Sequence, residues 1–274
     1  MTPVAKVIVI TGASGGIGAA LSVQLGQQGH RLVLAARREK ELNEVAQRVR
    51  GTAPGPVMLG DPEARGEAFV VPADVTRRAD VERLRDRALE RFGEVDVWVN
   101  NAGRGISRKV LDLTDEDFDQ MMLVNVKSAL YGMQAIAPHF MERNAGHIIN
   151  VSSFLSRVPF VAFRSAYNAA KAALNALTSN LRTDLAQTHP GIRVSLVMPG
   201  VVLTDFQRHA LGGTLPVRSP SPAAQGQTAD EAAAAIVRLI EQPAAEVYTN
   251  PAHAAVAAKY YQDVGAFEEQ WRRP

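Results

Sequence analysis

A tyrosine and a lysine lie four positions apart, at Tyr167 and Lys171, in the helix-like stretch over 165–186. Residues with this spacing project from one helix face, so a phenol and an ammonium meet there. A phenol has a pKa of about 10 and is a poor base at neutral pH. An ammonium about 4 Å away, at an effective dielectric constant of about 20, favours the phenolate by roughly 4 kcal/mol before desolvation opposes it. The pair predicts an acid/base tyrosine tuned by its lysine, although a core tyrosine beside an unrelated lysine has the same spacing.

A glycine-rich loop, "TGASGGIG" at 11–18, follows an apolar run near the start of the chain. Glycines let a backbone approach a phosphate, and the start of the following helix supplies free N–H groups. The letters GASGG also fit the nucleophile elbow of α/β hydrolases, with Ser14 as nucleophile. Neither His189 nor His209 lies in a convincing companion motif, and no Gly-Lys-Ser/Thr follows to form an ATP-binding loop. The loop therefore favours a dinucleotide cradle, with a serine hydrolase as the weaker alternative.

Strand-like and helix-like runs alternate along the chain and must position these groups. The strand-like runs cover 6–10, 31–36, 68–75, 95–103, 146–153, 192–200 and 245–250, and the helix-like runs cover 16–28, 40–50, 77–92, a long stretch from Thr114, 165–186 and a stretch from Thr228. The strands are continuous and β-branched, as in a parallel sheet buried on both faces. We expect one α/β domain over 1–274: a single Rossmann-type, doubly wound parallel sheet of about seven strands with helices on both faces. A Gly/Pro-rich surface insertion at 51–66 and a mobile substrate loop at 206–227 interrupt the pattern.

Composition excludes several classes of function. The 274 residues contain no cysteine, so disulfides and thiolate zinc sites are excluded, and six histidines show no metal-ligand spacing. The net charge of +2 comes from interspersed acids and bases, which argues against a nucleic-acid partner. No signal peptide or membrane-spanning run is seen, so we expect no membrane partner and a cytoplasmic protein.

Several short motifs occur in a fixed order along the chain. They are Thr11-Gly-x-x-x-Gly16-x-Gly18, "NNAG" at 100–103, Asn125, "VSS" at 151–153, Tyr167-x-x-x-Lys171 and "PGVVLTD" at 199–205. Together, over about 5–250, they resemble the short-chain dehydrogenase/reductase family in its shorter, single-domain branch. The resemblance implies an oxidoreductase that transfers a hydride between a nicotinamide and a carbonyl or alcohol.

The resemblance also implies roles for four catalytic residues. Tyr167 is the acid/base, Ser153 polarises the substrate oxygen, Lys171 also holds the nicotinamide ribose, and Asn125 supports a water-linked proton relay. Ser153 and Tyr167 are fourteen positions apart, one more than is usual in the family. Ser156 stands where the family commonly has glycine, which leaves Ser152 as a second candidate for the polarising serine.

Cofactor choice is predicted at the end of the second strand-like run. An NAD enzyme would place an acid there to bind the ribose 2′-hydroxyl. Here Ala36 is followed by Arg37 and Arg38, and guanidinium groups suit a 2′-phosphate, so NADP(H) is favoured over NAD(H). The predicted cofactor contacts are Gly12, Ser14, Gly15, Gly16, Ile17, Gly18, Arg37, Arg38, Asp74, Val75, Asn101, Ala102, Gly103, Tyr167, Lys171, Pro199, Gly200, Val202 and Thr204.

The substrate is specified least. Apolar residues cluster where the family's pocket wall lies: Phe154, Leu155, Val158, Phe160, Phe163, Phe206, Leu211, Leu215 and Val217. They favour a mostly apolar ketone, aldehyde or alcohol, or they simply pack in the core. Arg104, Arg108 and Arg164 could instead recognise an anionic group.

Three further questions stay open. Enzymes of this fold commonly pair through the helices that carry Asn125 and Tyr167, so a homodimer or homotetramer is expected. A non-catalytic dinucleotide-binding regulator of the same fold is the alternative function. The C-terminal stretch "AAVAAKYYQDVGAFEEQW" covers either a partner or the protein's own pocket.

Overall fold

The computed structural model describes residues 5–51, 66–213 and 226–270. Within these ranges the chain forms a seven-stranded sheet in the order β3-β2-β1-β4-β5-β6-β7, and every neighbouring pair is parallel. The strands are β1 (Val7–Thr11), β2 (Arg31–Ala36), β3 (Glu67–Pro72), β4 (Val97–Asn100), β5 (Gly146–Val151), β6 (Ile192–Met198) and β7 (Glu246–Tyr248). This sheet confirms the predicted doubly wound architecture.

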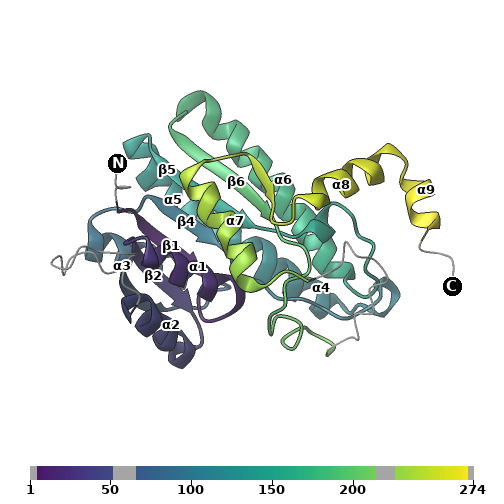
Figure 1. Cartoon of the computed structure of the whole chain (residues 1–274), viewed down its shortest axis with the longest axis horizontal. Coiled ribbons are helices and arrows are strands. Elements are labelled where there is room, and N and C mark those ends of the chain that lie inside the picture. The colour runs from purple at the N-terminus through teal and green to yellow at the C-terminus, as the bar shows by residue number, and fades with distance from the viewer. Residues whose placement is uncertain (1–4, 52–65, 214–225, 271–274) are drawn as a thin grey trace.

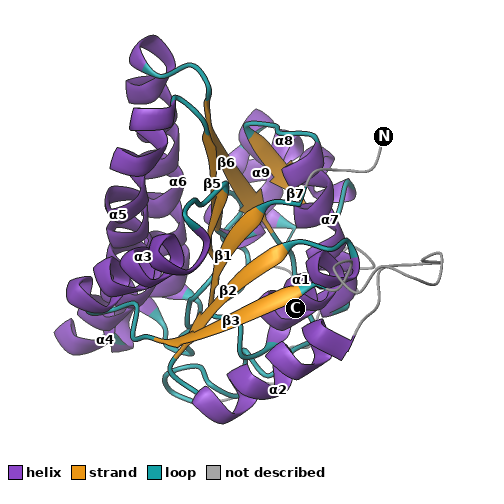
Figure 2. Ribbon diagram, turned by 90° about the vertical axis from the view of Figure 1, so that its left-hand side faces the viewer, coloured by secondary structure: helices purple, strands orange, loops and turns teal. Residues whose placement is uncertain are grey.

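Helices cover both faces of the sheet. They are α1 (Gly16–Gln27), α2 (Glu39–Gly51), α3 (Arg78–Phe92), α4 (Asp115–Met122), α5 (Ser128–Arg143), α6 (Ser165–Thr188), α7 (Ala229–Glu241), α8 (Ala252–Gln262) and α9 (Val264–Glu269). Figure 2 shows α1, α2 and α7 on one side and α3, α4, α5 and α6 on the other. Each layer buries its own apolar cluster against the sheet. In the described ranges no helix is long and apolar enough to cross a membrane.

The strand and helix ends follow from local chemistry. All five side chains of β1 are buried, so the strand carries no solvent-facing alternation. Thr228 caps α7 in a capping box with Glu231, and Thr114 caps α4 by accepting from the Asp117 N–H. These caps fix the first turns of the two helices at the positions where the sequence predicts helical stretches to begin.

The long helix expected from Thr114 is interrupted. After α4 the backbone makes a π-helical turn, Leu123–Lys127, before α5 begins. Asn125 lies in this turn, where the Nδ2 atom donates to the Met121 carbonyl at 3.1 Å. The sequence did not predict this widening, because no Pro or Gly marks it.

The order in which the chain adds strands to the sheet reverses between β1 and β4. The chain winds from β1 outward to β2 and β3, then returns to place β4 on the other side of β1. In such sheets ligands bind beyond the carboxyl ends of the strands at this switch point. Figure 1 shows α8 and α9 projecting beyond α6 at the C-terminal end of the chain. Of the two predicted interruptions, residues 52–65 and 214–225 lie outside the described residues.

Candidate active site

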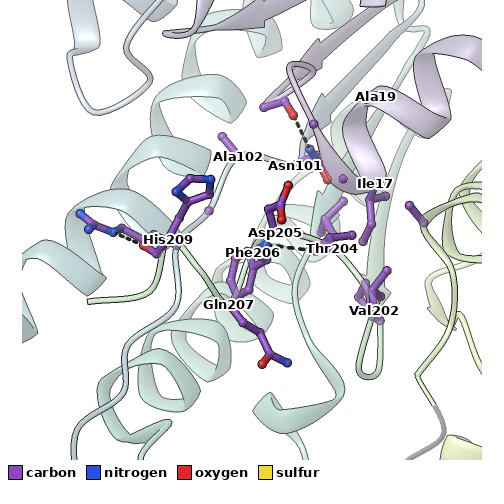
Figure 3. A pocket seen from close by; sticks show the side chains of 18 of the residues that line it. Ile17, Ala19, Asn101, Ala102, Val202, Thr204, Asp205, Phe206, Gln207 and His209 are labelled. Carbon is purple, nitrogen blue, oxygen red and sulfur yellow. Dashed lines mark hydrogen bonds between the residues drawn. The ribbon is translucent and has the colours of Figure 1, made fainter. Parts of the chain in front are cut away.

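A cleft of about 1070 Å³ opens at the carboxyl ends of the strands. Figure 3 shows part of it: Ile17, Val202 and Thr204 lie along one wall, and Phe206, Gln207 and His209 come from the segment that follows. Of the site residues that the sequence predicts, all line this cleft except Gly18 and Asn125, which lie directly behind its wall. The predicted residues that line the cleft thus come from seven separated parts of the chain.

The glycine loop is packed too tightly for side chains at two positions. Gly12 has a φ of 67°, and a Cβ there would lie 2.9 Å from the Ala102 Cα. A Cβ on Gly18 would lie 2.4 Å from the Gly12 carbonyl oxygen, so Gly18 lets α1 start directly against the loop. This close packing leaves the first N–H groups of α1 at the cleft, where they suit an anion.

Two polar residues tie the glycine loop to the end of β4. The Thr11 hydroxyl accepts from the Asn101 and Ala102 N–H groups at 3.0 and 3.2 Å. The Asn101 side chain donates to the Thr11 carbonyl at 2.9 Å. Asn101 therefore holds the loop and also lines the cleft, and its predicted cofactor contact stays a prediction.

The two arginines after β2 both reach the cleft. Arg37 is exposed and lines it. Arg38 extends across the glycine loop, where Nη2 donates to the Ser14 carbonyl at 3.3 Å and to the Ser14 hydroxyl at 3.2 Å. The Ser14 hydroxyl thus faces a guanidinium, an arrangement that gives no support to a hydrolase nucleophile.

Tyr167, Ser153 and Lys171 meet at the floor of the cleft. The Ser153 hydroxyl hydrogen-bonds to the Tyr167 phenol, whose residue is 8% exposed. The Lys171 Nζ atom donates to the Val151 carbonyl at 2.8 Å and lies 5.8 Å from the centre of the Tyr167 ring. The predicted helical spacing thus does bring the phenol and the ammonium together on one face of α6.

Burial is the largest influence on the pKa values of Tyr167 and Lys171. Burial raises the pKa of the Tyr167 phenol, while the hydrogen bond from Ser153 and the charge of Arg164 act in the opposite direction. Burial also lowers the pKa of Lys171 to about 8. The activation of Tyr167 by Lys171, together with the charge of an oxidised nicotinamide, stays a prediction. The Lys171 ammonium is directed to the end of β5, and desolvation outweighs the charges that favour the phenolate.

Ser152 and Ser153 point in different directions. The Ser152 hydroxyl donates to the Asn175 Oδ1 atom at 2.6 Å, whereas the Ser153 hydroxyl bonds to the Tyr167 phenol. Asn175 in turn donates to the Ser156 hydroxyl at 2.7 Å, and Ser156 donates to the Ser153 carbonyl. This network fixes the backbone of Ser153 and leaves the Ser153 hydroxyl for the cleft.

Asn125 lies behind Gly103. The Oδ1 atom of Asn125 accepts from the Arg104 N–H at 3.2 Å, and the Nδ2 atom donates to the Arg104 carbonyl at 2.9 Å. A Cβ on Gly103 would lie 2.9 Å from the Asn125 Oδ1 and 3.4 Å from the Lys171 Nζ. Gly103 therefore allows these two side chains to approach each other across the backbone.

Two aromatic contacts shape the substrate end of the cleft, and His253 is the partner that the sequence did not predict. Phe206 packs edge-on to Tyr167, with ring centres 5.8 Å apart. His253, from α8, stacks on Phe154 with ring centres 4.1 Å apart and planes 12° from parallel. His253 directly precedes the C-terminal stretch, and Ala257 and Phe267 of that stretch pack in one apolar cluster with Phe154. The stretch therefore contacts the protein's own chain beside the cleft wall, and its role towards a partner stays a prediction.

Comparisons with known proteins agree with the geometry. The short chain dehydrogenase family model matches residues 6–212. An uncharacterized oxidoreductase of Staphylococcus epidermidis is 38% identical over 201 residues, 73% of this chain and 80% of that protein. A short chain dehydrogenase/reductase from Burkholderia phymatum, solved in complex with NAD, is 28% identical with a TM-score of 0.80, covering 98% of this chain and 96% of that one. An alcohol dehydrogenase from the archaeon Thermococcus sibiricus, complexed with 5-hydroxy-NADP, is 28% identical with a TM-score of 0.73, covering 89% and 95%.

Proposed function

The chain belongs to the short-chain dehydrogenase family of oxidoreductases, and from this premise we propose that it transfers a hydride between NADP(H) and a carbonyl or alcohol substrate. Tyr167 is the acid/base in this proposal. The observation that carries it is the meeting of Tyr167, Ser153 and Lys171 at the floor of a cleft whose other end is a glycine loop.

The glycine loop and its surroundings fit a dinucleotide. Gly12 and Gly18 have no side chains, so the loop packs closely against Ala102 and α1 begins directly behind it. The N–H groups at the start of α1 are therefore available to a phosphate. Asp74 and Val75 line the adenine end of the cleft, and Val202 and Thr204 line the nicotinamide end. The bound nicotinamide supplies or accepts the hydride. The NAD and 5-hydroxy-NADP complexes of the structural relatives support this class of cofactor.

Arg37 and Arg38 are the basis for NADP(H) over NAD(H). Ala36 is buried at the end of β2, so no acid competes there with a 2′-phosphate. Both arginines line the cleft, and Arg38 is anchored on the glycine loop and paired with Glu41 at 3.4 Å, while Arg37 has no ion pair among the described residues. Two positive charges in this position favour the phosphorylated ribose.

The protonation state of Tyr167 suits reduction of a carbonyl. Because burial raises the pKa of Tyr167, the phenol is protonated at neutral pH and can donate a proton to a substrate oxygen. Ser153 polarises that oxygen, Lys171 holds the nicotinamide ribose, and Asn125 supports the relay that returns a proton to Tyr167. Apolar residues such as Leu155, Phe160 and Phe206 line the rest of this end and suit the carbon chain of a substrate.

We extend the proposal to the assembly and its location. The chain acts as one domain and pairs as a homodimer or homotetramer through the helices near Asn125 and Tyr167. Exposed apolar side chains at Val110, Leu111 and Phe118 support self-association on this side. The cysteine-free composition suits the cytoplasm, and the small net charge gives no reason to expect a nucleic-acid partner.

The test is NADPH oxidation against a panel of ketones and aldehydes, with wild type and Tyr167→Phe side by side. We expect the variant to lose about 10³-fold in kcat/KM and to bind NADPH within threefold of wild type. The regulator hypothesis gains if NADPH binds but no carbonyl on a broad panel is reduced.

The cofactor preference is tested by the ratio of NADPH to NADH affinity in Arg37→Ala and Arg38→Ala. We expect that ratio to fall at least tenfold, while Lys40→Ala, an exposed α2 residue outside the cleft, leaves it unchanged. An unchanged ratio in both arginine variants would contradict the NADP(H) assignment.

A further inference from the structure

A buried arginine lies next to the catalytic tyrosine. Arg164 immediately precedes α6, lines the cleft and is only 6% exposed. Its Nη1 atom donates to the Ile106 carbonyl at 2.9 Å. Across residues 5–51, 66–213 and 226–270, no carboxylate forms an ion pair with this guanidinium.

A guanidinium keeps its charge in proteins, so this burial is costly to the fold. Buried charged groups in a purely structural role are usually paired or fully hydrogen-bonded, whereas the Arg164 guanidinium donates to a backbone carbonyl. One carbonyl also uses a single donor of five, which leaves the rest of the planar fork without a charged partner. Because this guanidinium lies at the wall of a cleft, a negatively charged group of a ligand could pair with it.

The other two candidate arginines contrast with Arg164. Arg108 forms an ion pair with Asp117 at 3.0 Å and does not line the cleft. Arg104 lines the cleft, but its Nε atom donates to the His209 carbonyl at 2.8 Å and its side chain is partly exposed. Of the three arginines that the sequence offers for anion recognition, the structure buries only Arg164 beside the reacting groups.

The backbone around Arg164 is held in place from two sides. The Arg108 N–H donates to the Phe163 carbonyl at 2.8 Å, and the Ser165 hydroxyl donates to the Arg108 carbonyl at 2.8 Å. Phe163 itself has a φ of 68°, an uncommon conformation for a residue with a side chain. Gly105 leaves room for the guanidinium, since a Cβ there would lie 3.0 Å from the Arg164 Nη1 atom. Arg164 is therefore fixed before any ligand binds, as a specificity group should be.

We propose that Arg164 binds a carboxylate of the substrate, so that the enzyme acts on an oxo acid or the corresponding hydroxy acid. This inference rests on the proposed function, since it names the substrate class of the same site. Arg164 and Tyr167 are three residues apart at the start of one helix, a spacing that places Cβ atoms about 5–6 Å apart. The carboxylate therefore lies only a few carbon atoms from the reacting carbon. The planar fork of a guanidinium matches the two oxygens of a carboxylate.

Carboxylate binding also assists the proton transfer. The charge of Arg164 lowers the pKa of Tyr167, against the larger effect of burial. A bound carboxylate neutralises that charge and so keeps the phenol protonated in the complex. Tyr167 thus remains able to donate its proton to the carbonyl oxygen of the same substrate.

The first experiment compares acids with their neutral esters. The rate of NADPH oxidation is measured with 3-oxobutanoate, 4-oxopentanoate and 5-oxohexanoate and with the three methyl esters. We expect wild type to prefer at least one acid over its ester, and Arg164→Met to lose at least about 100-fold in kcat/KM for that acid. The ester rate should fall much less, so that the ratio of acid to ester rates falls in the variant. Arg164→Lys keeps the charge without the fork and should lie between the two.

Arg108→Met is the matched control, because Arg108 is a neighbouring arginine already paired with Asp117. It should leave the ratio of acid to ester rates unchanged. The inference is overturned if wild type reduces each ester as well as its acid, or if Arg164→Met lowers both rates equally. The second result would mean that Arg164 only supports the fold or tunes Tyr167.

A binding measurement separates this inference from the proposed function. The affinity of pentanoate, compared with methyl pentanoate, is measured by calorimetry in the presence of NADP⁺ for wild type and Arg164→Met. We expect pentanoate to bind wild type at least tenfold more tightly than the ester, and this difference to vanish in the variant. If no carbonyl is reduced but this difference is seen, the proposed function fails and the anion site stands. If carbonyls are reduced and pentanoate binds both proteins equally, the anion site fails alone.

Discussion

The two edges of the sheet handle charge in opposite ways. At the carboxyl edge, Lys171 and Arg164 are buried beside the cleft, and in the described residues each donates to a backbone carbonyl and forms no ion pair. At the amino edge, Arg143 lies between Glu94 at 3.1 Å and Asp96 at 3.4 Å. The Asp96 carboxylate also accepts from the Val7 N–H at 2.8 Å and so joins the starts of β1 and β4.

This contrast separates function from stability within one sheet. Cations without carboxylate partners reduce the stability of the folded chain, and their retention at a cleft indicates that a ligand uses them. Paired charges at the opposite edge serve the register of the strands and face no cleft. We therefore expect substitutions at the carboxyl edge to change activity without loss of stability, and substitutions at the amino edge to do the reverse.

Lys171→Met gives the largest expected effect. We expect kcat/KM to fall about 10³-fold, because the ribose and the tyrosine lose their ammonium partner. At pH 7 we expect the free energy of unfolding to rise by about 2 kcal/mol, since the folded chain no longer holds a buried ammonium. Chemical denaturation at a series of pH values measures the second effect.

The pH series fixes the cause of that gain. The pKa of Lys171 is lowered to about 8 in the folded chain, from 10.5 in the unfolded chain. The stability of wild type should therefore increase as pH rises from about 8 to 10.5, and the difference from Lys171→Met should shrink over that window. A variant that is less stable than wild type at pH 7 would break the contrast between the two edges.

His147, at the start of β5, should give the next largest effect. Burial lowers the pKa of His147 to about 4, and its Nε2 atom lies 2.7 Å from the Ser195 hydroxyl. The neutral ring stabilises the fold above pH 6.5, and this contribution is lost as pH falls from about 6.5 towards 4. We expect wild type to lose about 3 kcal/mol from this residue over that window, measured by denaturation at each pH.

The comparison with His147→Leu isolates this contribution from those of His30 and His139, whose pKa values are also lowered. The variant should show a correspondingly smaller pH dependence, with NADPH affinity unchanged. His189→Gln, at the end of α6, should keep the pH dependence of wild type. A dependence equally steep in His147→Leu would show that other groups cause the acid sensitivity.

The cofactor end of the cleft could be predicted from sequence because its geometry is local and made of backbone. Gly12 and Gly18 are required by contacts within one loop and the helix that follows, and the short motif contains both partners. The strand at 6–10 and the start of α1 also follow from neighbouring residues. Asn101 shows the limit, because its motif marked the position but not the direction of its amide.

The substrate end could be predicted only in part, because distant segments build it through side chains. The sequence named Arg164 among three arginines, and only the fold shows that Arg108 is neutralised by Asp117. His253 reaches Phe154 from almost one hundred positions away, and no short-range pattern encodes such a contact. The degree of burial of Tyr167 and Lys171, which shifts both pKa values, is a property of the whole fold and could not be obtained from their spacing.

Arg143→Met should give the smallest effect and provides the sharpest test of the amino edge. The ion pairs of Arg143 are about one-third exposed, so water screens them, but its Nη1 atom also donates to the Val95 carbonyl at 2.8 Å. We expect a loss of about 1 kcal/mol in the free energy of unfolding, which shrinks as salt rises from 0.05 to about 1 M. Lys40 is exposed and forms no ion pair with the described residues, so Lys40→Met should change stability by less than about 0.5 kcal/mol. NADPH affinity and kcat/KM should stay within twofold of wild type in both variants, because neither residue reaches the cleft. A loss of activity in Arg143→Met at unchanged stability would mean that the amino edge also controls the geometry of the cleft, and the division between the two edges would fail.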